Sequence, residues 1–269
     1  MATSTGSDNA VTFGGSTWRG PRLLEQYVGE LVSLSCPAAG SCVALTDLGM
    51  ATVLRDGRWS SLTAVDEQPG PPYPGMMASV SCTSARFCFA VDAEGNAEAY
   101  DGRSWTRPST IDGDSALNAL SCASPTFCAA VDGAGRALVL DGHRWSTPRA
   151  IDSAALVAVS CPTRSFCVAI DVLGRALRYE GHAWSSPTTI DTVGAGPLSV
   201  SCPVSGRCIA VDGDGAVLVF ENSVWSRPVT IDPNGSLTSV TCKSGTLDFC
   251  VAVDSNGNAL VSHDPFAHK

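Results

Sequence analysis

Basic residues and histidine are scarce in this sequence. Lys and Arg number 17 against 26 Asp and Glu, the formal net charge is −9, and only 4 His are present. A nucleic-acid backbone needs a basic surface, so this balance argues against DNA or RNA as a partner. No apolar run reaches the roughly 18 residues of a spanning helix, so we expect no membrane span. Residues 1–9 lack both a basic start and an apolar stretch, so we expect a disordered tail there and not a signal peptide.

Motifs of catalysis are also missing. The sequence contains no Gly-x-Ser-x-Gly, no His-Glu-x-x-His and no phosphate-binding loop. His143 and His182 fall in expected turns and His263 and His268 in the C-terminal tail, where a base is poorly placed beside a nucleophile. We therefore expect a protein that is not an enzyme.

A repeat runs through most of the chain, which is rich in Gly (26), Pro (16) and Cys (12). Each unit has a cysteine pair, then Asp-x-x-Gly, then Gly-x-x-Trp, and recurs about every 40 residues. The first cysteines of the units are Cys36, Cys82, Cys122, Cys161, Cys202 and Cys242. The tryptophans are Trp18, Trp59, Trp105, Trp145, Trp184 and Trp225. The cysteines and the tryptophans recur independently with the same period of about 40 residues, so the repeat defines the architecture.

Each unit predicts four short strands. Residues 79–82 and 87–91 represent the first two, which are almost continuously apolar or small, as in strands buried on both faces. Residues 136–140 represent the mixed third strand and 145–151 the polar fourth, whose proline suits an edge. This decline in hydrophobicity from first to last strand is typical of a β-propeller blade. We predict an all-β, six-bladed propeller with four-stranded blades.

The ends of the chain bear on how such a ring would close. Residues 10–21 align with the end of a unit and residues 237–262 with the beginning of one. We therefore expect an N-terminal strand to complete the last blade, which an open solenoid or two β-trefoils would not need. Ala10–Phe13 and Asn258–Ser262 both resemble the third strand, and we expect the C-terminal copy to take that position. The predicted propeller domain spans residues 10–262, followed by a C-terminal tail over 263–269.

The cysteines form one pair per unit. Each pair flanks the first hairpin, which places the two Cα atoms about 5–6 Å apart, within disulfide reach. The pairs are Cys36–Cys42, Cys82–Cys88, Cys122–Cys128, Cys161–Cys167, Cys202–Cys208 and Cys242–Cys250. A structural zinc ion needs four ligands and one cysteine pair provides two, so we predict one disulfide per blade and no metal. Because disulfides persist in oxidising compartments, we also predict a secreted, extracellular location. The alternative is a cytoplasmic protein with reduced thiols.

Two sets of carboxylates are candidate ligands. One set ends the second strand of a unit, at Asp92, Asp132, Asp171, Asp212 and Asp254, and the other ends the fourth, at Asp66, Asp112, Asp152, Asp191 and Asp232. Together they predict an acidic rim that binds sugar hydroxyls or calcium. The alternative is that Asp at the head of Asp-x-x-Gly bonds to its own turn, and recurrence in nearly every unit favours this role. We expect no cofactor, with calcium as a weak possibility.

The tryptophans and one insertion are the remaining candidates. Tryptophan at the start of the fourth strand is either a wedge between blades or a platform for a sugar ring. The insertion at 67–77 carries four prolines, which stiffen it for presentation of Tyr73 to a partner, or it is a neutral insertion.

The Ser-Cys…Cys…Val-Asp-x-x-Gly…Asp-Gly-x-x-Trp-Ser unit resembles the short repeats of secreted, lectin-like β-propellers, especially those of actinobacteria. That resemblance covers residues 10–262 and implies glycan pockets between adjacent blades, formed by an aromatic ring, carboxylates and Arg or Asn. The matching residues here are Trp105, Trp145, Trp184, Asp132, Asp171, Arg136 and Arg175, beside Asp92, Asp212 and Tyr73. We expect a monomeric, non-catalytic glycan-binding protein. The alternative is a protein-interaction scaffold or the targeting subunit of a larger secreted assembly.

Overall fold

The computed structural model describes most of the chain, in two compact units, Met1–Leu120 and Ser121–Lys269. The described residues are 2–4, 7–13, 17–23, 29–65, 76–113, 115–192, 196–243, 245–247, 249–263 and 265–266. Among them every regular element is a strand, and none forms a helix able to cross a bilayer.

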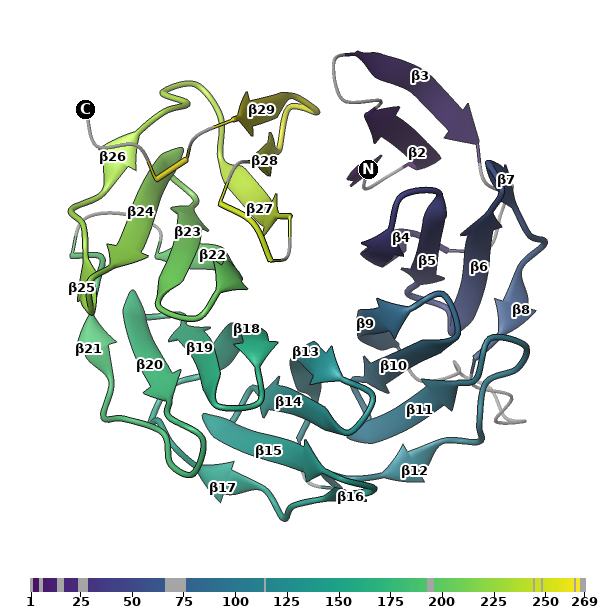
Figure 1. Cartoon of the computed structure of the whole chain (residues 1–269), viewed down its shortest axis with the longest axis horizontal. Helices are drawn as coiled ribbons and strands as arrows, with labels where there is room; N and C mark the ends of the chain where they lie inside the picture. Colours follow the sequence, from purple (N-terminus) through teal and green to yellow (C-terminus); the bar gives the residue numbers. More distant parts are fainter. Residues whose placement is uncertain are drawn as a thin grey trace. The chain divides into compact units, whose positions relative to one another are not determined.

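The fold is all-β, with six blades of antiparallel strands, as predicted (Figure 1). Blades 1 and 2 consist of β4 (Leu31–Ala38), β5 (Ser41–Thr46), β6 (Met50–Arg55), β7 (Arg58–Trp59) and β8 (Thr63–Ala64), then β9 (Met77–Ser84), β10 (Phe87–Asp92), β11 (Asn96–Tyr100) and β12 (Ser109–Thr110). Blade 3 consists of β13 (Leu117–Ser124), within which the unit boundary falls, β14 (Phe127–Asp132), β15 (Arg136–Asp141), β16 (Arg144–Trp145) and β17 (Arg149–Ala150). Blades 4 to 6 consist of β18 (Leu156–Thr163), β19 (Phe166–Asp171), β20 (Arg175–Tyr179) and β21 (Thr188–Thr189), then β22 (Pro197–Val204), β23 (Arg207–Asp212), β24 (Ala216–Glu221), β25 (Val224–Trp225) and β26 (Val229–Thr230), then β27 (Leu237–Cys242), β28 (Cys250–Asp254) and β29 (Ala259–Ser262).

The fourth strand of a blade is short. In blades 1, 3 and 5 it consists of two pieces that pair separately with the third strand, as β25 and β26 both pair with β24. In blades 3 and 5 the proline predicted for this strand, Pro148 or Pro228, lies between the pieces, where a missing N–H costs no ladder hydrogen bond.

The N-terminal segment forms a sheet of its own from β1 (Ala2–Ser4), β2 (Ser7–Phe13) and β3 (Trp18–Leu23). Strands therefore occur within residues 1–9, where the sequence predicts a disordered tail. Ala10–Phe13 lies in β2 and pairs with β3, while β29 pairs with β28, so both candidate copies of the third strand form strands. The described strand pairs of the last blade join β27, β28 and β29, and completion of that blade by the N-terminal strand stays a prediction.

All six predicted disulfides are present, one in each blade. Their Cα–Cα distances are 3.9–4.1 Å, shorter than the expected 5–6 Å. The physical reason is register: Cys82 and Cys88 are direct cross-strand partners in the β9–β10 hairpin, and so are Cys242 and Cys250 in β27–β28. Opposed residues of an antiparallel pair approach more closely than residues that merely flank a loop.

Burial is greatest in the second strand of each blade, not in the first. All six residues of β14 are buried, whereas β13 buries Leu117 and Leu120 and leaves its other residues partly exposed. The expectation of a first strand buried on both faces is wrong, because that strand is at the edge of its own sheet, whereas the second strand has a strand neighbour on each side.

Serine hydroxyls link the first strands of consecutive blades. In the second unit β18, β22 and β27 lie side by side (Figure 1), and the Cys202 N–H donates to Ser160 Oγ at 2.9 Å. In the first unit the Cys82 N–H donates to Ser35 Oγ at 2.9 Å. The same bond recurs at Val80–Ser33, Leu120–Ser79, Cys161–Ser121, Val240–Ser199 and Cys242–Ser201. The hydroxyl supplies an acceptor for an N–H on the open edge of a first strand, which explains the recurring Ser-x-Ser-Cys sequence.

The C-terminal segment, predicted as a tail over 263–269, contributes to the core. Phe266 is 6% exposed and packs with Ile209, Leu237 and other core residues of blades 5 and 6. Arg207 covers the ring, with its Cζ 5.6 Å from the ring centroid. The sequence predicts a C-terminal tail here, and the burial of Phe266 shows that this residue packs against the core.

Candidate functional site

The predicted carboxylates at the end of the second strand close the turn that follows. Asp132 is fully buried, and its Oδ1 accepts hydrogen bonds from the backbone N–H of Ala134 (2.9 Å) and of Arg136 (2.7 Å). The same pair of bonds recurs at Asp92, Asp171, Asp212 and Asp254. One oxygen of each Asp therefore accepts hydrogen bonds from the backbone of its own Asp-x-x-Gly turn. This is the alternative role that the sequence analysis gives for these residues.

The second carboxylate oxygen faces the residue four positions later. At Asp171, Arg175 Nε donates to Oδ2 at 2.5 Å, and the same guanidinium also binds Asp152. The hydrogen bond to Asp171 raises the pKa of Arg175 above its ordinary value; burial opposes this rise and the charges of both carboxylates add to it. Arg136 binds Asp132 in the same way. The two predicted arginines thus lie beside the predicted carboxylates, engaged with them.

Blades without this arginine differ in how they satisfy the second oxygen. In blade 2, Asn96 Nδ2 donates to Asp92 Oδ2 at 2.9 Å. In blade 5 the position is Ala216, and Asp212 Oδ2 has no hydrogen-bond partner within the described residues, although Asp212 is 1% exposed. Blade 5 is thus the exception in this series.

Two of the predicted tryptophans pack against an aromatic ring of their own blade, and Trp105 also contacts the core cluster shared by blades 1 and 2. The Trp105 ring centroid lies 5.0 Å from that of Tyr100, and the Trp184 centroid 5.4 Å from that of Tyr179, with tilted planes. Trp145, at the same position of blade 3, is half-buried beside the third strand. Each of the first two indoles has a ring neighbour from the third strand, an arrangement that serves core packing.

The insertion at 67–77 falls almost entirely on residues 66–75, which lie outside the described residues. The predicted contribution of Tyr73 to a partner contact therefore stays a prediction.

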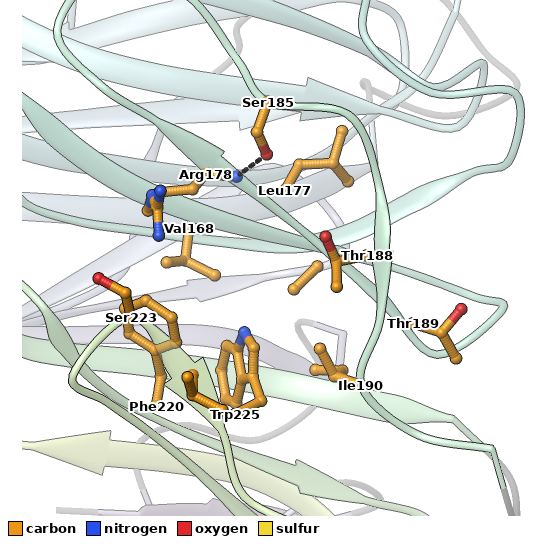
Figure 2. A pocket seen from close by; sticks show the side chains of 12 residues that line it. Val168, Leu177, Arg178, Ser185, Thr188, Thr189, Ile190, Phe220, Ser223 and Trp225 are labelled. Carbon is orange, nitrogen blue, oxygen red and sulfur yellow. Dashed lines mark hydrogen bonds between the residues drawn. The ribbon is translucent and has the colours of Figure 1, made fainter.

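A pocket of about 420 Å³ lies within the second unit, between the outer strands of blades 4 and 5 (Figure 2). Phe220 and Trp225 extend from β24 and β25 on one side, and Leu177 and Ile190 of blade 4 lie on the other. The lining consists of Val168, Ala176, Leu177, Arg178, Ser185, Thr188, Thr189, Ile190, Phe220, Ser223, Val224 and Trp225.

The pocket combines apolar walls with hydroxyl groups and one cation. The hydroxyls come from Ser185, Thr188, Thr189 and Ser223. Arg178 Cζ lies 5.9 Å from the Phe220 ring centroid, and Arg178 Nε donates to Glu180 Oε1 at 2.8 Å. The Arg178 side chain is 34% exposed, so its charge is shared between Glu180, the ring face and solvent. Ser185 Oγ accepts the backbone N–H of Arg178 at 3.0 Å, drawn as the dashed line in Figure 2.

The turn that contributes Ser223 to the pocket differs in sequence from the other units. Asn222 and Ser223 have φ of 53° and 66°, in the left-handed region that glycine prefers. In blades 3 and 4 glycine (Gly142, Gly181) occupies the position of Asn222. Ser223 also lines the pocket. Asp56 and Gly57 form the equivalent two-residue hairpin loop of blade 1 and also have positive φ, 50° and 75°, so this backbone is that of a tight hairpin turn and the difference lies in the side chains.

Over the described ranges, no cluster of three or more His, Cys, Asp or Glu side chains is arranged to hold a metal ion.

The repeat, the blades and the disulfides define the class of protein as a β-propeller. No family model matches the sequence, and no curated protein matches it. Among solved structures the chain is similar to "YCF48 bound to D1 peptide", with TM-score 0.70 and 16% identity over 96% of this chain and 86% of that one. YCF48 from Cyanidioschyzon merolae gives TM-score 0.69 and 16% identity over 94% and 86%. The WD40 repeats of RRP9 give TM-score 0.69 and 12% identity over 97% and 80%. At these identities the likeness shows the fold alone.

The pocket residues were missed from the sequence. The prediction looked for positions that recur in every blade, whereas the pocket lies where blade 5 departs from the others. The available signal was Glu221-Asn222-Ser223-Val224, which replaces the Asp-Gly or Glu-Gly turn of blades 1 to 4.

Proposed function

We propose that this protein is a non-catalytic scaffold that binds a segment of a partner protein, and that the pocket between blades 4 and 5 receives an apolar side chain of that segment. The observation that carries the proposal is the pocket itself. Aromatic and aliphatic walls with a few polar groups among them are the usual composition of a ligand-binding site.

The surface around the pocket supports a protein partner. Val224 lines the pocket and is 67% exposed, and Val229 on the outer strand of the same blade is 57% exposed. Arg144 and Arg149 occupy the corresponding positions of blade 3. Solvent-facing valines in place of arginines make the outer strand of blade 5 apolar, as expected for a surface that a partner covers.

Arg178 indicates the chemistry of the flanking residue. Its guanidinium lies over Phe220 and is partly exposed. A carboxylate of the partner, placed beside the bound side chain, would compete with Glu180 for this cation. The favoured ligand is therefore an aromatic or aliphatic side chain next to Asp or Glu.

The fold is consistent with this use. One of the similar propellers is described as bound to a peptide. The six disulfides are compatible with work in an oxidising, extracellular compartment, where such bonds persist.

Glycan binding is the second candidate. One indole, Trp225, together with four hydroxyl groups and one arginine would also suit a sugar ring. Trp225 thus replaces the predicted Trp105, Trp145 and Trp184 as the favoured aromatic for this role.

The experiment is selection of a random displayed peptide library, and in parallel a glycan array, on the disulfide-bonded full chain. We expect peptides with a shared aromatic or aliphatic anchor next to a carboxylate. The informative variant is Val224→Arg, because blades 1 and 3 carry Arg58 and Arg144 at this hairpin position, so the fold tolerates it. The matched control is Arg144→Val in blade 3.

Affinity of the selected peptides should fall at least about tenfold in Val224→Arg, equivalent to about 1.4 kcal/mol, and stay unchanged in Arg144→Val. Equal binding to both variants would remove the pocket from the proposal. If no peptide consensus emerges and the protein instead binds glycans, and if Val224→Arg weakens that glycan binding, the function of the pocket is glycan binding and not peptide binding.

A further inference from the structure

Two exposed apolar side chains lie on the turn that joins β19 to β20. Val172 is 49% exposed and Leu173 is 61% exposed. We propose that this turn is a second subsite for the partner segment whose apolar side chain enters the pocket between blades 4 and 5. The second subsite rests on the proposed function and extends it, because it makes the partner an extended segment with two apolar anchors.

The turn does not need these side chains for its own geometry. Asp171 Oδ1 accepts the backbone N–H groups of Leu173 (3.0 Å) and Arg175 (2.7 Å). The same pair of bonds closes this turn in blades 2, 3, 5 and 6. The two middle positions are filled there by small or polar residues, which are Ala93-Glu94, Gly133-Ala134, Gly213-Asp214 and Ser255-Asn256. The backbone of the turn thus forms equally well without valine or leucine, so the turn itself does not account for them.

The turn continues one wall of the pocket. Ile190, which lines the pocket, donates its backbone N–H to Gly174 O at 2.9 Å, and Gly174 directly follows Leu173. Thr189, another lining residue, is the register partner of Arg175 where β20 pairs with β21. A partner segment that fills the pocket and continues past Thr189 and Ile190 therefore meets the exposed turn next.

The chain that enters blade 5 adds a third apolar side chain near the turn. A Cβ added at Gly196 would lie 3.2 Å from Val172 O, so this chain passes the turn closely. Leu198, two residues later, is 40% exposed, whereas blade 6 has Thr238 and blade 3 has Asn118 at the corresponding position. Exposed apolar side chains gathered at one place are typical of a surface that a protein partner covers.

The length of β20 sets the spacing of the two anchors. The pocket reaches Arg178 on this strand, and the turn lies just before Arg175, where the strand begins. The stretch from Arg175 to Arg178 spans about 10 Å at roughly 3.3 Å per residue. We therefore expect an aromatic or aliphatic anchor in the pocket and a second, aliphatic anchor about three to five residues away, on Val172 and Leu173.

The test measures the affinity of a consensus peptide, selected from the displayed library on the disulfide-bonded full chain. The double variant Val172→Gly/Leu173→Ala gives blade 4 the turn of blade 3. The matched control, Gly133→Val/Ala134→Leu, gives blade 3 the turn of blade 4. Val224→Arg reports separately on the pocket. A second peptide carries serine in place of the anchor expected on the turn.

We expect the Kd of the consensus peptide to rise at least about tenfold in Val172→Gly/Leu173→Ala and to stay unchanged in the matched control. The serine peptide should bind the wild type about as weakly as the consensus peptide binds the blade 4 variant. It should lose nothing further on that variant, because both changes remove the same contact. Melting temperatures check folding, and Leu173→Glu, which carries the residue of the blade 2 turn, replaces the double variant if that variant does not fold.

Three outcomes would overturn the second subsite. Peptide binding that is sensitive to Val224→Arg but not to the change of turn would keep the pocket and remove the second subsite alone. Absence of any peptide consensus would remove the proposed function and the second subsite together. A wild-type dimer in sedimentation that becomes monomeric in Val172→Gly/Leu173→Ala, with unchanged peptide affinity, would assign the turn to a contact between copies of this chain.

Discussion

Replacement of Phe266 by alanine tests whether the C-terminal segment is part of the core. The ring is 6% exposed among core residues of blades 5 and 6. Phe→Ala at such a position costs about 3–5 kcal/mol, and we expect about 3 because a segment near the chain end relaxes into part of the cavity. Loss of the Arg207 contact, with Cζ 5.6 Å from the ring centroid, adds about 0.5–1 kcal/mol.

The assay is guanidinium unfolding with the disulfides intact, followed by tryptophan fluorescence. The midpoint should fall in Phe266→Ala without a change in the denaturant slope, since the mutation alters stability and not the surface exposed on unfolding. Phe266→Leu keeps an apolar side chain and should lose less than about 1.5 kcal/mol. His263→Ala, at an exposed residue of the same segment whose ring centroid lies 5.5 Å from that of Phe249, should lose no more than about 1 kcal/mol. A midpoint for Phe266→Ala equal to that of His263→Ala would refute the docking of this segment.

Two further predictions concern single side chains. Ser160→Ala removes the acceptor of the Cys202 N–H and should lower the free energy of unfolding by about 1–3 kcal/mol in the same assay. Ser165→Ala, at an exposed serine, should leave the free energy of unfolding almost unchanged. Equal effects of the two variants would contradict a stabilising role for the hydrogen bond between blades. Burial opposes ionisation of Asp254, but hydrogen bonds, led by the one from the Asn258 side chain, outweigh it and lower the pKa of Asp254 in the folded protein. The ionised Asp254 therefore stabilises the fold above the unfolded pKa of about 3.9, and this stabilisation is lost as pH falls through the lower folded pKa. Asn258→Ala should start this loss at higher pH in a series of melting temperatures against pH, and superimposable wild-type and variant profiles would contradict the assignment.

Within a blade, the sequence was a good guide. The cysteine pairs, the Asp-x-x-Gly turns and the four-strand order depend on residues close together in the chain, so each leaves a local pattern. Asp132 illustrates this, because its turn contacts reach only to Ala134 and Arg136. The same local pattern misled the burial prediction for the first strand, since small apolar residues there indicate close packing and not burial on both faces.

The sequence pattern did not predict the contacts between neighbouring blades. The Ser160–Cys202 hydrogen bond joins residues 42 positions apart, and the Ser-x-Ser-Cys motif gave no reason for its own recurrence. The pocket was missed for a related reason. Phe220 and Trp225 occupy ordinary repeat positions, and they line a cavity together with blade 4 residues such as Ile190 that are distant from them in the chain.

The amino-acid sequence alone determined the repeat, the blade and the sulfur pairing, because these are set by short-range spacing that every unit copies. Only the tertiary structure decided that Asp212 lacks the cation given to Asp171, that Phe266 belongs to the core and that blade 5 opens a pocket. Those features depend on which side chains of different units meet, and spacing within one unit carries no information about that.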